Sequence, residues 1–262
     1  MEIAVLVKQV PEDLGAVRLT AGHTVDRSAG PAVTDPVDRN ALEAAVQLAE
    51  AVGGTVTVIT VGPASAKAVL KECVSVGATR GVHVSDEGLA GSDALGTARV
   101  LAAAVRQLSA TTPVDLVLAG AKSFDGATAA VPAMVAELLD LPQVTTVTEI
   151  VAEDGALVCR QVLDDGHARV RLSLPGVVSV DEYINTPRYP SVKSRLAANK
   201  ATFEVLTATD LGVTEVGAAA ARAVVLGTTV PPAREPGVRI TGEDARDTAD
   251  KLVAALVGAG VL

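Results

Sequence analysis

Short apolar runs alternate with helix-like segments through the first half of the chain, and this alternation constrains the fold more than any other feature. The apolar runs cover residues 3–7, 55–61, 82–84 and 114–119. Segments with apolar side chains every three or four residues follow them, at residues 37–49, 65–76, 92–108 and 131–138. Strands joined by helices through short connections form a parallel sheet with right-handed crossovers.

Capping residues and a hairpin pattern refine this prediction. Asp35-Pro36 favours a helix start, because the carboxylate caps the free N–H groups and proline suits the first turn. Ser92 is the predicted cap of the third helix. Residues 17–20 and 24–26 flank Ala21-Gly22-His23, which predicts a small hairpin.

The later part of the chain follows a β pattern. Its strand-like runs are residues 144–150, 157–163, 168–174 and 177–180. Glu153-Asp154-Gly155 and Asp164-Asp165-Gly166 separate the first three runs, and acidic residues before glycine favour tight hairpin turns. We therefore expect all the strands of this later part to be antiparallel, and an α/β fold whose sheet is mainly parallel with an antiparallel portion.

The C-terminal part is predicted to lie outside the α/β domain. Residues 185–191 form an exposed loop, residues 192–200 are basic, and residues 203–206 form a last strand. Residues 207–242 lack a core pattern and contain several prolines, which is typical of an extended arm. Residues 243–258 form a helix whose apolar face is buried on this domain or on another subunit. The predicted division is residues 1–206 and 207–262.

The composition excludes several classes of function. The formal charge is −9, there is no tryptophan, and the only phenylalanines are Phe124 and Phe203. A nucleic-acid surface needs basic and aromatic side chains, so none is expected. Neither Cys73 nor Cys159 has a partner at metal-ligand or disulfide-framework spacing, and the three histidines are isolated. With neither a signal-peptide pattern nor a membrane span expected, we predict a cytoplasmic protein without a metal site.

Residues 114–139 carry a weak nucleotide-binding pattern. A buried strand leads through Gly120, Ala121, Gly126 and Ala127 into a helix, and such turns bind phosphate groups in many α/β folds. Asp125 is predicted as the helix N-cap or as an acceptor for a ribose hydroxyl. An ordinary strand-to-helix connection with a capping aspartate is the alternative, since neither standard phosphate-binding fingerprint is present.

Three motifs later in the chain are more specific. They are residues 160–166 (RQVLDDG), 171–180 (RLSLPGVVSV) and 184–191 (INTPRYPS). Their order and spacing resemble the β subunits of electron transfer flavoproteins. Residues 7–11, 62–63, 77–83, 125–126 and 210–213 fit the same family at the expected places.

The resemblance implies a Rossmann-like fold of the adenine-nucleotide α-hydrolase kind. It implies a heterodimer with an α subunit that holds most of the redox FAD, and residues 207–262 would pack on that subunit. Common members bind AMP in the β subunit, and electron-bifurcating (FixA-like) members bind a second FAD there. The assembled protein carries electrons from flavin-dependent dehydrogenases to a quinone oxidoreductase or another acceptor. The β subunit would be an electron-carrier subunit and not an enzyme.

The nucleotide pocket follows from the resemblance by position. The phosphate would lie at residues 126–131, with Thr128 donating a hydroxyl, and Asp35 would accept the adenine amino group. Pro11 to Asp13 would help form a wall over the flavin. The predicted cofactor-binding residues are Val7, Asp35, Gly62, Ala66, Gly120, Asp125, Gly126, Ala127, Thr128, Ala129, Ala130 and Val131.

Residues 185–200 match the family's docking loop. The predicted contacts with dehydrogenases are Pro190, Val192, Lys193, Arg195 and Leu196. An apolar anchor ringed by charges concentrates binding energy in such interfaces. A solvated basic loop is the alternative.

Two other functions remain as alternatives. A stand-alone nucleotide-binding protein of the universal-stress type would not need residues 160–191 or the C-terminal arm. An adenylyl-transferring enzyme on the same fold would need a phosphate-gripping motif such as S-G-G-x-D-S or H-x-G-H, and neither occurs.

Overall fold

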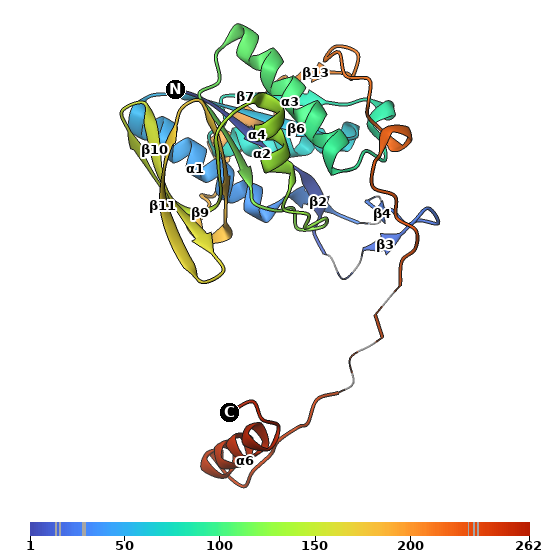
Figure 1. Ribbon diagram of the computed structural model, residues 1–262, viewed down its shortest axis with the longest axis vertical. Helices are drawn as coiled ribbons and strands as arrows, with labels where there is room; N and C mark the ends of the chain where they lie inside the picture. Colours follow the sequence, from blue (N-terminus) through green and yellow to red (C-terminus); the bar gives the residue numbers. More distant parts are fainter. Residues whose placement is uncertain (14, 16, 28–29, 230, 233, 235) are drawn as a thin grey trace. The chain divides into compact units, whose positions relative to one another are not determined.

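The computed structural model describes the chain except residues 14, 16, 28–29, 230, 233 and 235. The described chain divides into two compact units, Met1–Leu226 and Gly227–Leu262. The first unit contains the main β-sheet, and the second contains the terminal helix (Figure 1).

A nine-stranded sheet organises the first unit. Its strands are β1 (Glu2–Leu6), β6 (Thr55–Val61), β7 (Arg80–Val84), β8 (Leu116–Gly120), β9 (Gln143–Glu153), β10 (Ala156–Leu163), β11 (Gly166–Ser173), β12 (Gly176–Val180) and β13 (Glu204–Leu206). They are arranged in the order β11-β10-β9-β12-β8-β1-β6-β7-β13. β1 is parallel to β6 on one side and to β8 on the other, so the predicted parallel sheet is confirmed.

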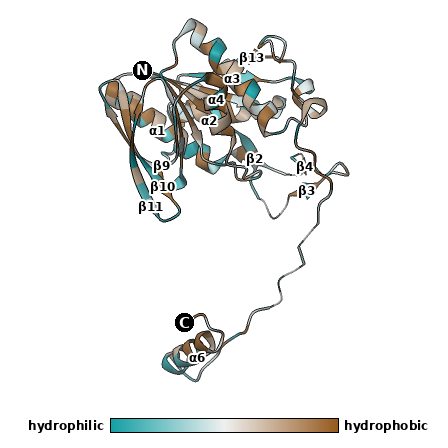
Figure 2. Ribbon diagram, viewed as in Figure 1, coloured by the Kyte–Doolittle hydropathy of each residue, from teal (hydrophilic) through white to brown (hydrophobic). Residues whose placement is uncertain are grey.

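Helices cover both faces of the parallel strands. They are α1 (Pro36–Val52), α2 (Lys67–Val76), α3 (Ala94–Thr111) and α4 (Val131–Leu139), and the short α5 (Val192–Ala198) packs on α2. α1 and α2 share a core with Ile3 and Val5, whereas α3 and α4 share a second core with Ala4 and Leu6. Because strands buried on both faces are apolar at most positions, the sequence shows apolar runs, although β6 also buries Thr57 and Thr60. Figure 2 shows hydrophobic colouring within the body of the first unit and hydrophilic colouring at the free end of the β10-β11 hairpin.

The antiparallel portion is the hairpin series β9-β10-β11. β10 pairs antiparallel with both neighbours through the two predicted acidic-glycine turns. β12 follows these hairpin strands in the sequence, but it pairs parallel with both β8 and β9. The mixed sheet is therefore confirmed, and β12 belongs to its parallel part.

The predicted cap of α1 is confirmed, and that of α3 is wrong. Asp35 accepts a hydrogen bond from the Val37 N–H at 3.0 Å. The N-cap of α3 is Asp93, whose carboxylate accepts from the Gly96 N–H at 2.8 Å. Ser92 instead donates its hydroxyl to the Leu89 carbonyl. Both residues are suitable caps, and Asp93 has the role because α3 begins at Ala94, one residue later than a Ser92 cap requires.

Two pairs of short strands lie between β1 and α1 in the sequence. β2 (Gln9–Pro11) pairs with β5 (Ala32–Thr34), and β3 (Arg18–Leu19) pairs antiparallel with β4 (Val25–Asp26). The second pair is the hairpin predicted around residues 21–23.

The segment after β13 begins by packing on the first unit. Ala208, Leu211, Val213 and Val216 contact the core under α3. The second unit contains α6 (Ala245–Gly258), which Asp244 caps. Its apolar side chains Leu252, Val253 and Val257 are 46–57% exposed. Of the helices in the described ranges, none combines the length and apolar character needed to cross a membrane.

Candidate nucleotide site

The predicted pocket residues gather at the carboxyl edge of β6, β1 and β8. From β1 the chain goes to β6 and β7 on one side of the sheet, and β8 and β12 lie on the other side. The strand order therefore reverses between β1 and β8. In open α/β sheets, ligands bind in the crevice at such a reversal.

Asp38, which the sequence did not single out, joins the two strands at this crevice. Its carboxylate accepts from the backbone N–H of Lys8 at 2.7 Å and from that of Gly120 at 3.0 Å. A Cβ atom on residue 120 would lie 2.6 Å from the Asp38 Oδ1. Gly120 is therefore needed for close approach to the α1 terminus, and its ligand contact remains a prediction.

Asp35 lies beside Asp38 and holds the loop after β8. Its side chain accepts from the Phe124 N–H at 2.6 Å as well as from Val37, and the residue is fully buried. Burial raises the pKa of Asp35. Burial, and then the charge of Asp35, raise the pKa of Asp38 to about 8. Both oxygens of Asp35 already serve backbone donors, so an adenine contact would use their remaining lone pairs.

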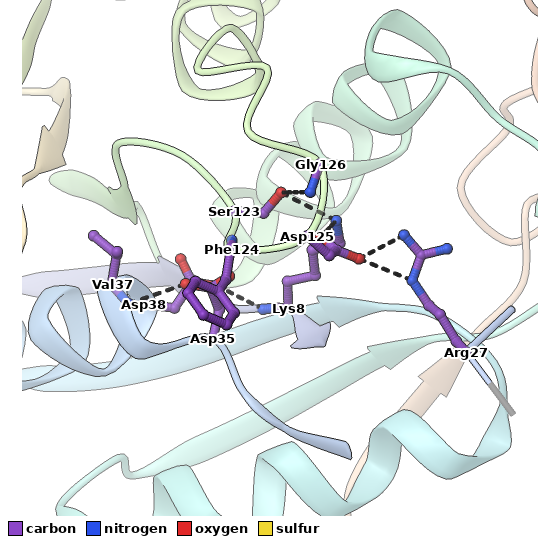
Figure 3. A network of polar contacts seen from close by, with 9 residues as sticks. All are labelled: Lys8, Arg27, Asp35, Val37, Asp38, Ser123, Phe124, Asp125 and Gly126. Carbon is purple, nitrogen blue, oxygen red and sulfur yellow. Dashed lines mark hydrogen bonds and ion pairs between the residues drawn. The ribbon is translucent and has the colours of Figure 1, made fainter. Parts of the chain in front are cut away.

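Asp125 is not the N-cap of α4, so that prediction is wrong. α4 begins at Val131, and Ala130 at its N-cap has no side-chain cap bond among the described residues. The Asp125 carboxylate instead accepts from Lys8 Nζ at 2.5 Å, and from Arg27 Nε at 3.0 Å and Nη2 at 2.6 Å (Figure 3). Burial opposes ionisation, but the hydrogen bonds and charges of Lys8 and Arg27 lower the pKa of Asp125.

The loop from Ser123 to Ala130 has a defined non-helical shape. The Ser123 hydroxyl accepts from the Gly126 N–H and from Lys8 Nζ, both at 3.2 Å. Ala127 and Ala129 have φ angles of 48° and 51°, in the left-handed region that costs energy for residues other than glycine. Gly126, Ala127, Thr128 and Ala129 are exposed. The helix start thus lies at Val131 and not at Gly126.

The first turn of α4 provides few backbone donors. Pro132 has no N–H group, and the Met134 N–H already donates to the Ala130 carbonyl. The N–H groups of Val131 and Ala133 remain for an anion in that turn. Donors for a phosphate would therefore come from the exposed loop as well as from the helix.

Val7, Gly62 and Ala66 line the neighbouring part of the same edge. Val7 is buried and donates its N–H to the Ile59 carbonyl at 3.0 Å. A Cβ atom on residue 62 would lie 3.0 Å from the Ala66 Cβ, so this turn is tight. The structure thus brings the pocket residues predicted from β1, β6 and β8 to one edge.

The predicted docking loop is a short helix with exposed apolar residues. α5 begins after Ser191, whose hydroxyl accepts from the Ser194 N–H at 3.0 Å. Val192 is 78% exposed and Leu196 is 62% exposed. Tyr189, which precedes the helix, is 93% exposed. The structure leaves these side chains available for a partner.

The polar residues that support the nucleotide pocket and the docking loop were not predicted from the sequence. At the pocket they are Lys8, Arg27, Asp38 and Ser123, and beside the docking loop they are Asn40, Glu43, Glu50 and Arg188. Arg27 and Asp125 are 98 positions apart, and Arg188 and Glu43 are 145 apart. No local pattern reveals such pairs.

Other side chains with reactive groups, those of the two cysteines and of His83, are buried. Cys73 and Cys159 are free and buried. His83 is buried, and its Nε2 lies 3.1 Å from the Gly62 carbonyl oxygen. Within the described part of the chain, no cluster of His, Cys, Asp and Glu is suited to a metal ion.

Comparison with known proteins identifies the family. Residues 22–211 match the model of the electron transfer flavoprotein domain. An electron transfer flavoprotein subunit beta of Mycobacterium tuberculosis is 41% identical over 92% of each chain. Another, from Thermoanaerobacterium thermosaccharolyticum, is 37% identical over 92% of this chain and 93% of its own. The caffeyl-CoA reductase-Etf complex subunit CarD of Acetobacterium woodii is 34% identical over 98% of each chain. The chain belongs to the electron transfer flavoprotein β-subunit family and is an electron-carrier subunit.

Proposed function

We propose that this chain, within a heterodimeric electron transfer flavoprotein, holds an adenine nucleotide at the crevice between β1 and β8. The observation that carries the proposal is the shaped loop at this strand reversal. Asp35 binds the Phe124 N–H of the loop, Asp125 ties the loop to Lys8 and Arg27, and residues 126–129 between these contacts and α4 are exposed. A loop fixed before binding loses little conformational entropy when a ligand arrives.

AMP is the nucleotide that we favour. Thr128 and the backbone N–H groups from Gly126 to Val131 would bind its single phosphate, and Val7, Gly62 and Ala66 would contact the adenosine. A second FAD is the alternative. The CarD relative favours that alternative, since its name places it in a complex with a reductase.

The α subunit is the proposed partner for α6 and the arm. The apolar face of α6 is not buried by the described residues of its own unit. An amphipathic helix gains stability when it buries such a face, which a larger subunit would allow. The shared FAD would lie between the subunits, with the neighbourhood of Pro11 and Asp13 as one wall.

Flavin-dependent dehydrogenases are the proposed electron donors. They would contact Pro190, Val192 and Leu196, with Lys193 and Arg195 at the edge of the interface. The reduced flavoprotein would then pass electrons to a quinone oxidoreductase or another acceptor. We propose that this exchange takes place in the cytoplasm.

Nucleotide analysis of the purified complex tests the proposal. This chain is co-expressed with its candidate α subunit, and the released nucleotides are separated by chromatography and counted per heterodimer. We expect one FAD and one AMP. Two FAD and no AMP would assign the second flavin to this pocket. A complex with flavin but without any second nucleotide would contradict a nucleotide site at β1 and β8.

A further inference from the structure

Hydrogen bonds and ion pairs attach the first part of the docking loop, residues 185–188, to α1. We propose that Arg188 is a positioning residue that fixes Tyr189, Val192 and Leu196 in the orientation a dehydrogenase recognises. The inference rests on the proposed docking function and adds the contact that orients the docking residues. We call the contact of Arg188 with Glu43 and Glu50 the arginine clamp.

The arginine clamp uses most of the hydrogen-bonding capacity of one guanidinium group. Arg188 Nε and Nη2 donate to the two carboxylate oxygens of Glu43 at 2.8 and 3.0 Å. Nη1 and Nη2 donate to the two oxygens of Glu50 at 2.7 and 3.0 Å. The Arg188 backbone N–H also donates to Glu43 at 3.2 Å. Two bidentate contacts fix the direction of the chain as well as its position.

A second contact fixes the same segment one turn earlier on α1. The Asn40 side-chain amide donates to the Asn185 carbonyl at 2.9 Å, and the Asn185 amide donates back to the Asn40 carbonyl at 3.0 Å. Asn40 and Glu43 are 6% and 5% exposed. Residues 185–188 are therefore held at two points on one face of α1.

The other end of the docking segment is anchored by apolar contacts. Ala198 at the end of α5 is 2% exposed, and α5 packs on α2. Phe203 lies so close to Gly81 that a Cβ atom there would be 2.6 Å from the ring. The largely exposed residues 189–196 thus span two fixed anchors.

The arrangement suits recognition of a partner with an apolar pocket bordered by carboxylates. Tyr189, Val192 and Leu196 provide apolar area, and tyrosine is common among residues that dominate binding energy. Lys193 and Arg195 give this patch a positive rim in a chain of net charge −9. Because the anchors order the patch before contact, less conformational entropy is lost on binding.

Arg188→Gln and Glu50→Gln in the heterodimer test the role of the clamp. The probe is a purified flavin-dependent dehydrogenase that reduces the wild-type heterodimer, with the flavoprotein as varied substrate. We expect the KM for the flavoprotein to rise roughly tenfold in Arg188→Gln and less in Glu50→Gln, while kcat stays unchanged. Arg188→Lys restores the charge without the planar fork, so it should recover only part of the affinity.

Arg171→Gln is the matched control, because Arg171 Nε pairs with Glu153 at 3.3 Å in an exposed contact of the β9-β10-β11 hairpin series, which has no assigned part in docking. Its KM should equal that of the wild type. Hydrogen exchange gives an independent readout, and backbone amides of residues 189–198 should exchange faster in both clamp variants. Flavin content and reduction by dithionite should not change.

A purely structural role would give a different result. If Arg188→Gln and Glu50→Gln lower the melting temperature but leave the KM within twofold of the wild type, the positioning role is wrong. If Arg188→Gln does not fold, Glu50→Gln decides the question, since Glu50 is largely exposed and its loss leaves Glu43 bound to Arg188. Failure of every tested flavin dehydrogenase to reduce the wild type would instead contradict the proposed function.

Discussion

At the scale of single residues, the left-handed alanines of the pocket loop offer the sharpest test of the phosphate position. Ala129 is exposed and has a φ angle of 51°, which asparagine and aspartate adopt more readily than alanine. We expect Ala129→Asn to retain the bound nucleotide. Ala129→Asp has the same shape but adds a negative charge, so it should lose most of the nucleotide through repulsion. Chromatography of the nucleotide released from each purified heterodimer measures the difference. Equal retention by both variants would place the phosphate elsewhere.

Asp38 predicts a pH dependence of stability. Its pKa rises from 3.8 to about 8 on folding, so the folded chain binds a proton that the unfolded chain has released between these values. The stabilisation is therefore complete below about pH 4 and is lost as the pH rises to about 8, at up to about 1.4 kcal/mol per pH unit. Asp38→Asn cannot titrate, although it loses about 1–3 kcal/mol by turning one acceptor into a donor.

Urea unfolding of the wild type and of Asp38→Asn between pH 5 and 8 measures this effect. The stability advantage of the wild type should shrink as the pH rises, because only the wild type must ionise Asp38. A constant difference across the range would show that Asp38 is already ionised at pH 5.

At the scale of elements, the sequence predicted the strands and helices better than their contacts. The run at residues 55–61 matches β6 because apolar periodicity is a local property, and the same holds for the two acidic-glycine turns. Asp125 was predicted as a cap from its place before a helical pattern. Its actual partners, Lys8 and Arg27, depend on how distant segments meet. β12 was expected to be antiparallel and this was wrong, since a short apolar run does not reveal whether its neighbours are parallel.

At the scale of the whole molecule, the second unit should determine assembly and not the fold of the first unit. Leu252→Glu places a charge on the exposed apolar face of α6, whereas Asp250→Gln changes a polar position of the same helix. We expect Leu252→Glu to prevent co-purification with the α subunit while Asp250→Gln retains it. Size-exclusion chromatography of the co-expressed chains gives the result. A stable heterodimer with Leu252→Glu would exclude this face from the interface.

The central position of β1 has a consequence for synthesis of the chain. β1 is made first, but its neighbour β8 begins at Leu116, and Ile3 pairs with that residue. At about 5–20 residues per second, a ribosome needs roughly 5–20 s to add the intervening residues. During that time this fully buried strand has an unpaired edge of Ile3, Ala4, Val5 and Leu6, which can pair with another chain. The nascent chain thus has a period of vulnerability that the finished protein does not show.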